Sequence, residues 1–318
     1  MRIFRHFNAL PDDAKGAAVA VGNFDGVHKG HQAVIHEAGV IAKDTTRDVT
    51  GDGKRPWAVL TFEPHPRKLF APDQPPFRLT PFAAKAEAIE AMGVDLLIVQ
   101  RFDTAFSQME AKDFVIEALV GGLNASHVVA GYDFVFGYKR SGHCDMLLAM
   151  GREHNFGFTA VNAVEDGTGQ VYSSTRVRDC LANGDLDGAK ALLGRDFQYR
   201  GRVMHGQRRG HTIGFPTANI ALGQAVCPRL GVYAIRAQAG GCGEWRDGVA
   251  NIGVRPTFGG DGVVLEVHLF DFDGDLYGQR MHVRLIGFLR DEKKFDGIGD
   301  LKTQIALDVT KAMEILTV

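Results

Sequence analysis

The sequence predicts an α/β protein in which a parallel sheet flanked by helices is followed by a small antiparallel β-barrel with a terminal helix. In the first half, apolar strand-like runs alternate with helical patterns, which is typical of a sheet with helices on both faces. From residue 197 onward, short apolar strands are separated by glycine turns, which favours a barrel. A chain of 318 residues is long enough for two cores. We expect the domains to span residues 1–187 and 188–318.

Each strand expected in the first half is an apolar run. The runs are Ala17–Val21, Trp57–Phe62, Val94–Val99, His127–Ala130 and Phe158–Val164. Between them, Thr80 and Pro81 predict the start of one helix. Ser107 and Glu110 form a capping-box pattern that predicts the start of another, which ends at residues 121–122. In sheets of this kind, ligands bind beyond the carboxyl ends of the strands.

The second half begins with helical patterns and then changes to strands. Ser174 and Thr175 are typical of a helix start, Asn183 with the following glycine of a helix end, and a further helix is expected over Asp185–Leu193. The expected strands are Tyr199–Met204, Val232–Ala237, Gly248–Val254, Val263–Phe270 and Met281–Leu289. The terminal helix is predicted by the helical spacing of Leu301, Ile305, Val309, Ala312 and Leu316.

The composition is that of an ordinary globular protein, with 45% hydrophobic and 23% charged residues. A net charge of −2 gives no reason to expect nucleic acid or a membrane as a partner. The four cysteines are scattered, which favours reduced thiols. We find neither a secretory signal nor an apolar run near the ~20 residues that span a bilayer, and we expect a cytoplasmic protein. The patterns make no prediction of oligomeric state.

The segment Gly22–His31, directly after an apolar run, is suited to binding phosphates. A glycine-rich turn that leads into a helix presents backbone N–H groups and the positive end of the helix dipole to an anion. His28 and His31 share one helical face and can both donate hydrogen bonds to the same group. They are either solvated loop histidines or residues that stabilise charge on a nucleotide triphosphate attacked at its α-phosphorus. The segment is neither a P-loop nor a dinucleotide fingerprint.

Two further segments of the first half have both a structural and a functional interpretation. In Ser173–Arg178, the hydroxyls and Arg178 form either a plain helix cap or a second anion cradle. In Gly131–Gly137, the aromatic side chains are either core residues or an apolar surface for a planar ring. On the second interpretation, Asp133 is its polar anchor.

The second half contains a candidate metal and proton-transfer site. If the chain is extended after Pro216, Thr217 and Asn219 project to the same side, and their oxygens suit Mg²⁺. The alternative is an ordinary turn and an edge strand. Glu266 lies on the opposite strand face from its apolar neighbours, where it either faces solvent or accepts a proton from an attacking alcohol. The stretch 201–210 is a candidate flap over phosphates.

Taken together and in this order, these motifs resemble the bacterial bifunctional riboflavin kinase/FAD synthetase (FMN adenylyltransferase) family. The resemblance covers nearly the whole chain through Gly22–His31, Thr61–Pro66, Gly131–Gly137, Ser173–Arg178, Gly214–Asn219, Asn251–Phe258 and Glu266–Gly278. It implies a nucleotidyltransferase-type first domain that transfers AMP from ATP to FMN, yielding FAD and pyrophosphate. It also implies a flavokinase-type barrel that phosphorylates riboflavin with ATP, and Mg²⁺ at both sites.

The resemblance also implies the site residues. In the first domain they are the catalytic His28 and His31, the ATP-binding Gly22, Asn23, Phe24, Asp25, Ser174, Thr175 and Arg178, and the FMN-binding Phe62, Pro64 and Asp133. In the second domain they are the general base Glu266, the Mg²⁺ ligands Thr217 and Asn219, and nucleotide or flavin contacts from Gly206, Gly214, Pro216, Arg290 and Phe295.

Two positions depart from the family pattern. Val135 stands where arginine is common, so one phosphate contact is either missing or supplied by Arg140. His211 stands where arginine or lysine is common, which implies weaker or pH-sensitive nucleotide binding. The alternatives to a bifunctional enzyme are a riboflavin kinase with an impaired adenylyltransferase domain and a non-catalytic flavin-binding protein.

Overall fold

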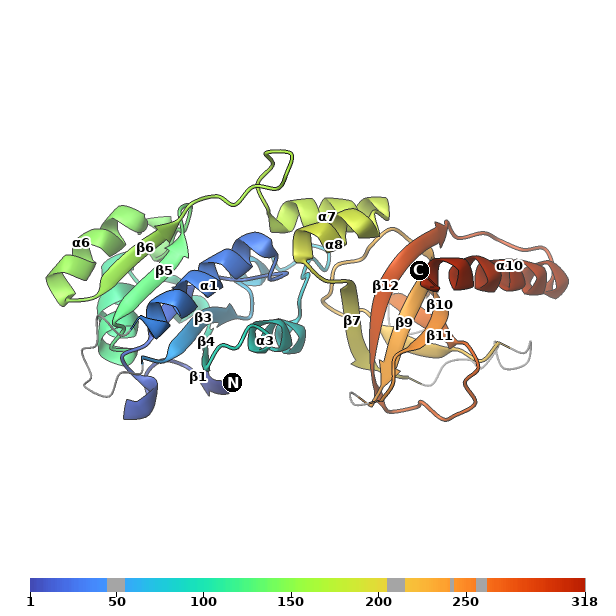
Figure 1. The fold of residues 1–318 in the computed structure, drawn as a ribbon, viewed down its shortest axis with the longest axis horizontal. Helices are drawn as coiled ribbons and strands as arrows, with labels where there is room; N and C mark the ends of the chain where they lie inside the picture. The colour runs from blue at the N-terminus through green and yellow to red at the C-terminus, as the bar shows by residue number, and fades with distance from the viewer. Residues whose placement is uncertain (45–54, 205–214, 241–242, 256–261, 318) are drawn as a thin grey trace. The chain divides into compact units, whose positions relative to one another are not determined.

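The computed structural model describes residues 1–44, 55–204, 215–240, 243–255 and 262–317 (Figure 1). Contacts within the chain divide it into two compact units. The first unit consists of Met1–Gln74 and Phe82–Ser173, and the second of Pro75–Pro81 and Ser174–Val318. The predicted residues Gly206, His211 and Gly214 lie outside the described part of the chain.

The first unit is built on a six-stranded sheet with the order β1-β4-β3-β2-β5-β6, in which every pair is parallel. The strands are β1 Arg2–Arg5, β2 Ala18–Val21, β3 Trp57–Glu63, β4 Leu96–Arg101, β5 His127–Gly131 and β6 Gly157–Val161. The predicted parallel sheet is confirmed. The edge strand β1 was not predicted, because its side chains are largely exposed and form no apolar run.

Helices cover both faces of this sheet, as predicted. Its helical segments are η1 Asp12–Ala14, α1 Lys29–Lys43, α2 Pro66–Phe70, α3 Phe82–Glu90, α4 Thr104–Ser107, α5 Ala111–Asp113, the π-helix η3 Phe114–Gly122, η4 Tyr138–Arg140 and α6 Cys144–His154. On β2, Ala18 and Ala20 belong to the core under α1 and α3, whereas Val19 and Val21 belong to the core under η3 and α6. This alternation buries β2 on both faces, which explains its continuous apolar sequence.

The predicted capping box at Ser107 is wrong. Asp103 caps α4, because its Oδ1 accepts a hydrogen bond from the backbone N–H of Phe106 at 3.0 Å. Ser107 is the last residue of that helix, and its hydroxyl donates to the carbonyl of Thr104 at 2.7 Å. The next helical stretch begins at Ala111 and ends, as predicted, at Gly122. The serine hydroxyl is therefore used by the preceding turn and not by the helix that follows.

The second unit contains the predicted small antiparallel barrel with the strand order β7-β12-β9-β10-β11-β8. The strands are β7 Phe197–Arg202, β8 Ala218–Ala221, β9 Gly231–Ala239, β10 Arg246–Arg255, β11 Gly262–Leu269 and β12 Arg280–Arg290. A bridge between Met204 and Asn219 joins the two ends of the sheet. A Cβ on Gly201 would lie 2.3 Å from Ile220, so glycine permits this close approach of β7 and β8.

In the described part of the second unit, three helices accompany the barrel. They are α7 Ser174–Asn183, α8 Leu186–Leu193 and the terminal α10 Ile298–Leu316. Ala312 and Leu316 of α10 belong to a buried cluster with Val232 and Ala234 of β9, which confirms the helix that its apolar spacing predicted. The predicted boundary at residues 187/188 falls inside α8, whereas the compact units divide after Ser173. The position at which the two activities divide therefore stays a prediction.

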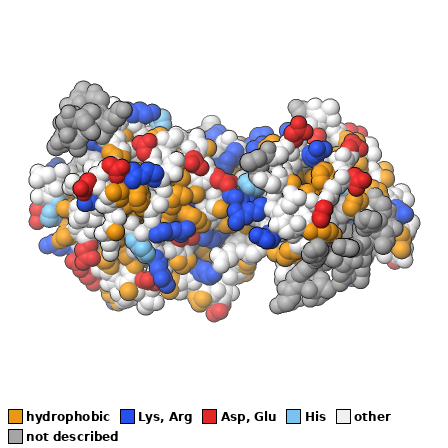
Figure 2. Space-filling model, turned by 90° about the horizontal axis from the view of Figure 1, so that it is seen from below, with side chains coloured by type: hydrophobic (Ala, Val, Ile, Leu, Met, Phe, Trp, Pro, Cys, Tyr) orange, Lys and Arg blue, Asp and Glu red, His pale blue; other side chains and the backbone are white. Residues whose placement is uncertain are grey.

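The segment 75–81 is part of the second unit although its neighbours in sequence belong to the first. Arg78 forms a parallel bridge with Ala225, and the backbone N–H of Val226 donates to the Arg78 carbonyl at 2.8 Å. No helix within the described residues is both long and apolar enough to cross a membrane. Acidic and basic side chains both occur on the face shown in Figure 2, in keeping with the small net charge.

Candidate active sites

The strand order of the first unit brings two of the predicted sites to one place. Strand β2 is followed in the sheet by β3 and β4 on one side and by β5 and β6 on the other. Loops that leave neighbouring strands at such a switch point diverge and create a crevice at the carboxyl edge of the sheet. The segment Gly22–His31 follows β2 and the segment Gly131–Gly137 continues from the end of β5, so they flank this point.

The turn after β2 has an unusual backbone. Phe24, Gly26 and Val27 all have positive φ angles, of 50°, 93° and 46°. For a β-branched residue such as Val27 this conformation is strained, and both Phe24 and Val27 are almost completely buried. A Cβ on Gly22 would lie 2.9 Å from the Phe24 ring. The packing of the buried Phe24 and Val27 therefore holds the turn in this conformation. At position 22 only glycine fits, because a Cβ there would be too close to the Phe24 ring.

His28 and His31 lie together at the start of α1. The rings are stacked, with centroids 3.6 Å apart and planes inclined by 22°. His28 is the N-cap of α1, and its Nδ1 accepts a hydrogen bond from the backbone N–H of His31 at 3.3 Å. Because Nδ1 is an acceptor, the neutral ring of His28 carries its proton on Nε2. The cap thus makes Nε2 the hydrogen-bond donor of this side chain.

A buried lysine that was not among the predicted site residues supports the turn. The Nζ of Lys85, on α3, donates to the carbonyl of Asn23 at 2.9 Å and to Thr61 Oγ1 at 3.2 Å. It also pairs with Glu63 Oε1 at 2.9 Å. The sequence pattern could have indicated this buried lysine, because Lys85 lies three residues after Phe82, on the face of its helix that was predicted to be apolar.

The predicted FMN residues follow β3 and β5. Phe62 is buried within a group of phenylalanines whose neighbouring ring centroids lie 5.4–6.3 Å apart; the group is Phe62, Phe70, Phe102, Phe106, Phe114, Phe134 and Phe136. Pro64 and Asp133 are exposed. Val135 is 46% exposed, and Arg140 is exposed on the same loop. Phe62 is therefore a core residue of this edge, whereas Pro64 and Asp133 are accessible.

Cys144 supports the loop after β5. Its thiol, at the start of α6, donates to the carbonyls of Gly131 at 3.5 Å and Tyr132 at 3.4 Å. Burial raises the pKa of the Cys144 thiol above its usual value, so that the group remains a neutral donor.

The predicted second phosphate cradle belongs to the second unit. Ser174 and Thr175 form the first turn of α7, with Ser174 half-buried and Thr175 exposed. Arg178 donates from Nε to the carbonyl of Phe77 at 2.8 Å, which links α7 to the segment 75–81. The role of these residues toward the nucleotide stays a prediction.

In the barrel, strand register aligns a row of polar residues. Glu266 on β11 lies opposite Asn219 on β8 and, on its other side, opposite Asn251 on β10. Residues directly opposite each other in an antiparallel pair share one face of the sheet. Thr217 immediately precedes β8 and is half-buried. The register thus brings together the predicted base Glu266 and the predicted Mg²⁺ ligand Asn219, and it adds Asn251, which was not predicted.

His268 is a second barrel residue that was not predicted. It lies two residues after Glu266 on the same face of β11, and its Nδ1 donates to the carbonyl of Pro216 at 2.9 Å. The hydrogen bond fixes the segment that carries Thr217. A cavity of about 530 Å³ adjoins this segment, and its lining includes Pro216, Thr217, Val203, Leu269, Phe272 and Tyr277.

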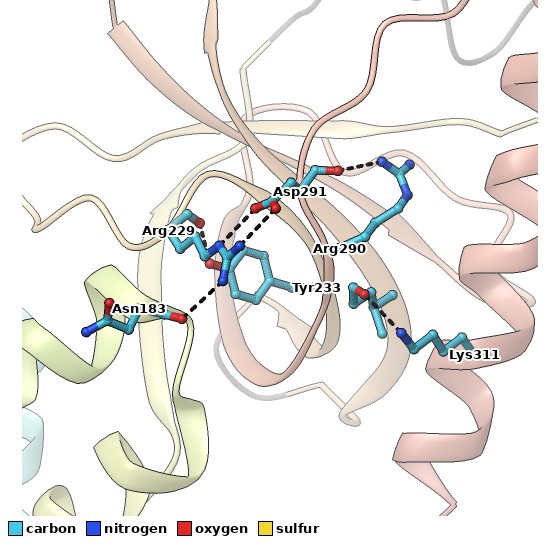
Figure 3. A network of polar contacts seen from close by, with 7 residues as sticks. Asn183, Arg229, Tyr233, Arg290, Asp291 and Lys311 are labelled. Atoms are coloured by element: carbon cyan, nitrogen blue, oxygen red, sulfur yellow. Dashed lines mark hydrogen bonds and ion pairs between the residues drawn. The ribbon is translucent and has the colours of Figure 1, made fainter.

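Arg290 is tied to the terminal helix. Its Nε and Nη2 donate to the carboxylate of Asp308 on α10 at 2.9 and 2.7 Å, and the two side chains are 18% and 7% exposed. Nη1 donates to the carbonyl of Asp291 at 2.9 Å, as Figure 3 shows. The ring of Phe295 lies 5.9 Å from the guanidinium carbon. These contacts of Arg290 are with the protein itself, and its contact with flavin remains a prediction.

In comparisons with known proteins, two family models match successive parts of the chain. The FAD synthetase family model matches residues 10–176, and the riboflavin kinase model matches residues 193–316. The chain is 41% identical over 317 residues to the bifunctional riboflavin kinase/FMN adenylyltransferase of Haemophilus influenzae, covering 98% of both chains. It is 36% identical over 309 residues to that of Bacillus subtilis, covering 96% of this chain and 94% of the relative.

Solved structures include one that is similar over nearly the whole chain. A Streptococcus pneumoniae protein described as a macrolide-efflux protein superposes with a TM-score of 0.82 at 29% identity, covering 98% of both chains. The family models match both parts of the chain, and the relatives match it from end to end. The chain therefore belongs to the bifunctional riboflavin kinase/FMN adenylyltransferase family.

Proposed function

We propose that FMN is adenylylated at the carboxyl edge of β2, β3 and β5, and that riboflavin is phosphorylated along the row formed by Asn219, Glu266 and Asn251. The main support is the neighbouring position of β2 and β5, because it sets the histidine pair beside the loop that carries Asp133. A non-catalytic flavin-binding protein does not fit a chain whose two parts match two enzyme families.

In the first reaction, a phosphate oxygen of FMN attacks the α-phosphorus of ATP and pyrophosphate leaves. Negative charge grows on the phosphate oxygens as the new bond forms. We propose that Nε2 of His28 donates a hydrogen bond to one of these oxygens, and that the strained turn Gly22–Asp25 holds the phosphates beside the helix start. The stacked His31 shares this task. No covalent enzyme intermediate is needed.

We assign the FMN end of this site to the loops after β3 and β5. Pro64 supplies an exposed apolar surface, and Asp133 supplies an exposed polar anchor. Val135 offers no charge to the FMN phosphate. We propose that Arg140, which is exposed on the same loop, contacts the FMN phosphate instead.

In the second reaction, the terminal hydroxyl of riboflavin attacks the γ-phosphorus of ATP and ADP leaves. The hydroxyl proton must go to a base, and we propose that the carboxylate of Glu266 accepts it. The cavity beside Thr217 is wide enough for part of a nucleotide, and the apolar part of its lining, which includes Val203, Leu269 and Phe272, suits an adenine ring. Through its hydrogen bond to Pro216, His268 holds Thr217 toward this cavity.

The oxygens of Thr217 and Asn219 fit Mg²⁺ bound together with a nucleotide. Both are neutral hard ligands, and Mg²⁺ usually takes its remaining ligands from phosphates and water. Among the described residues no group of three or more His, Cys, Asp or Glu side chains could hold a metal on its own, which suits such a shared site. When bound, Mg²⁺ neutralises phosphate oxygens during transfer.

We further propose that the enzyme acts in the cytoplasm on small molecules, without a nucleic-acid or membrane partner. The net charge of −2 and the free thiols of Cys144, Cys180 and Cys227 support this proposal.

The proposal is tested by separating the two activities in the full-length enzyme. Asn is a good N-cap, so His28→Asn preserves the helix cap but removes the ring donor. We expect FAD formation from FMN to fall about 100-fold, while FMN formation from riboflavin stays within about twofold of wild type. Glu266→Gln has the reverse effect. Each product is quantified chromatographically with ATP and Mg²⁺ in excess.

Three outcomes contradict parts of this proposal. Wild-type rates of both reactions in either variant would show that its residue is misassigned. Failure of the wild-type enzyme to convert FMN to FAD would support the alternative of an impaired adenylyltransferase domain. If Arg140→Ala left the KM for FMN unchanged, Arg140 would not replace the missing arginine at Val135.

A further inference from the structure

Lys85 is a fully buried cation that the chemistry above does not use. Its ammonium donates to Asn23 O, Thr61 Oγ1 and Glu63 Oε1, at 2.9, 3.2 and 2.9 Å. The side chain of Lys85 is 0% exposed and that of Glu63 is 12% exposed. An ammonium has three N–H donors, so these acceptors use all of them. Burial of a lysine is costly unless such partners are present, and here each partner lies at the carboxyl edge of the sheet.

The contact with Asn23 controls the backbone of the turn. The Asn23 carbonyl also accepts from the hydroxyl of Thr61 at 3.2 Å, so two donors hold it. In a planar trans peptide, the carbonyl and the following N–H point in opposite directions. Anchoring Asn23 O therefore fixes the direction of the Phe24 N–H, in a turn where Phe24 already has a positive φ of 50°. Backbone N–H groups in such turns bind phosphates.

The contact with Glu63 links this turn to a second strand end. Glu63 is the last residue of β3 and precedes Pro64, which we assigned to FMN. We infer that Lys85 is a positioning residue for adenylyl transfer, holding the turn that binds the ATP phosphates in register with the strand end that meets FMN. This inference rests on the function proposed for the first unit.

A purely structural role for Lys85 predicts different kinetics. If the lysine only stabilises the fold, its loss lowers the unfolding temperature and the fraction of active enzyme, but the folded molecules keep their KM for ATP. If it positions the turn, the folded variant binds ATP phosphates less well, and KM for ATP rises together with a fall in kcat/KM.

The test uses the full-length enzyme with Lys85→Met, which keeps the length of the side chain and removes its donors. At a temperature where circular dichroism shows a folded protein, we expect kcat/KM for ATP in FAD formation to fall about 30-fold, with a raised KM. Riboflavin phosphorylation, measured in the same sample, stays within about twofold of wild type. Lys15→Met is the matched control. Lys15 pairs with the exposed Asp12 at 2.9 Å and precedes β2, at the opposite edge of the sheet.

Thr61→Val provides a graded second variant. It removes one of the two hydrogen bonds to Asn23 O and one of the three acceptors of Lys85, with little change in shape, and it keeps the Lys85 side chain. We expect KM for ATP to rise about fivefold. This variant decides the question alone if Lys85→Met does not fold.

The inference would be overturned if Lys85→Met and Thr61→Val both kept the wild-type KM for ATP. If only one of them folds, a wild-type KM in that variant would overturn it. His28→Asn separates that failure from failure of the proposed function. If His28→Asn retains wild-type FAD formation, the proposed site is itself wrong. If His28→Asn loses FAD formation while the other two variants keep wild-type constants, the site stands and only the role of Lys85 falls.

Discussion

His28 completes the start of a helix and, in the reaction proposed above, also donates a hydrogen bond to the substrate. Its Nδ1 caps α1 through the backbone of His31, and this hydrogen bond leaves Nε2 as the donor. The hydrogen bond that completes the helix start therefore also sets the tautomer of the neutral ring. Lys85 stabilises the same turn by donating a hydrogen bond to the carbonyl of Asn23.

Tyr199 makes the barrel sensitive to alkaline pH. Its phenol is fully buried and donates to the carbonyl of Val226 at 2.7 Å, and burial raises the pKa of Tyr199 well above its usual value. Above about pH 10 the unfolded chain releases this proton while the folded protein keeps it, so the free energy of unfolding falls as pH rises. We expect a loss of up to about 1.4 kcal/mol per pH unit above that point, and none below it.

The measurement is urea unfolding of wild type and Tyr199→Phe between pH 8 and pH 11, followed by tryptophan fluorescence, to which Trp57 and Trp245 both contribute. The variant loses the hydrogen bond, about 1 kcal/mol, at every pH. Its alkaline slope is shallower than that of wild type. The remaining slope includes Tyr233, a second phenol whose pKa is raised by burial. Equal slopes in the two proteins would contradict the prediction.

At the scale of elements, α10 is held to the barrel by one buried ion pair. Arg290 on β12 and Asp308 on α10 form two hydrogen bonds, and the apolar side of the helix adds Ala312 and Leu316. Lys311 also donates to the carbonyl of Leu289 at 3.0 Å (Figure 3). The helix therefore depends on polar contacts at its middle as well as on burial.

Asp308→Ala is expected to destabilise the barrel by about 3 kcal/mol, because it leaves the Arg290 guanidinium buried without its partner. The chain contains a matched control. Arg229 and Asp291 form a similar pair of hydrogen bonds, both at 2.8 Å, but their side chains are 42% and 64% exposed. Asp291→Ala is therefore expected to destabilise the protein much less than Asp308→Ala.

Denaturant midpoints of the two variants measure the difference. If both variants lost a similar free energy of unfolding, burial would not determine how much these ion pairs contribute to stability. The double variant Arg290→Leu/Asp308→Leu is expected to recover part of the loss, since it removes both charges together.

At the scale of the whole molecule, the chain crosses between its two units more than once. The segment 75–81 belongs to the second unit, and so does α7, which precedes the predicted boundary at residue 187. Leu181 of α7 accepts a hydrogen bond from the backbone N–H of Arg229 at 2.8 Å, and both Val177 and Leu181 are fully buried.

We therefore expect a protein of residues 174–318 to be more stable than one of residues 188–318. Loss of α7 exposes apolar surface on the helices that remain, and we expect a cost of at least about 2 kcal/mol. Thermal unfolding of the two proteins, with riboflavin kinase rates measured in parallel, tests this expectation. Equal unfolding temperatures would contradict it.

Local patterns in the sequence were sufficient for much of the fold and for parts of both candidate sites. The alternation of strands and helices, the barrel strands and the terminal helix are periodic signals, and the histidines at a helix start are a local motif. Ser107 was misread because a local pattern does not show that its hydroxyl serves the turn before it. The ion pair of Arg290 could not be predicted, because its partner Asp308 is contributed by another element, and the contact of Arg290 with flavin stays a prediction.

By itself, the sequence determined the order of the elements and the chemical types of the residues at their ends. Only the tertiary structure decided which ends meet: β2 beside β5, Glu266 between Asn219 and Asn251, and Lys85 beneath the turn at Asn23. The physical reason is that strand order and register are set by packing between segments far apart in the chain, whereas helix starts and strand periodicity arise from hydrogen bonds and burial among near neighbours.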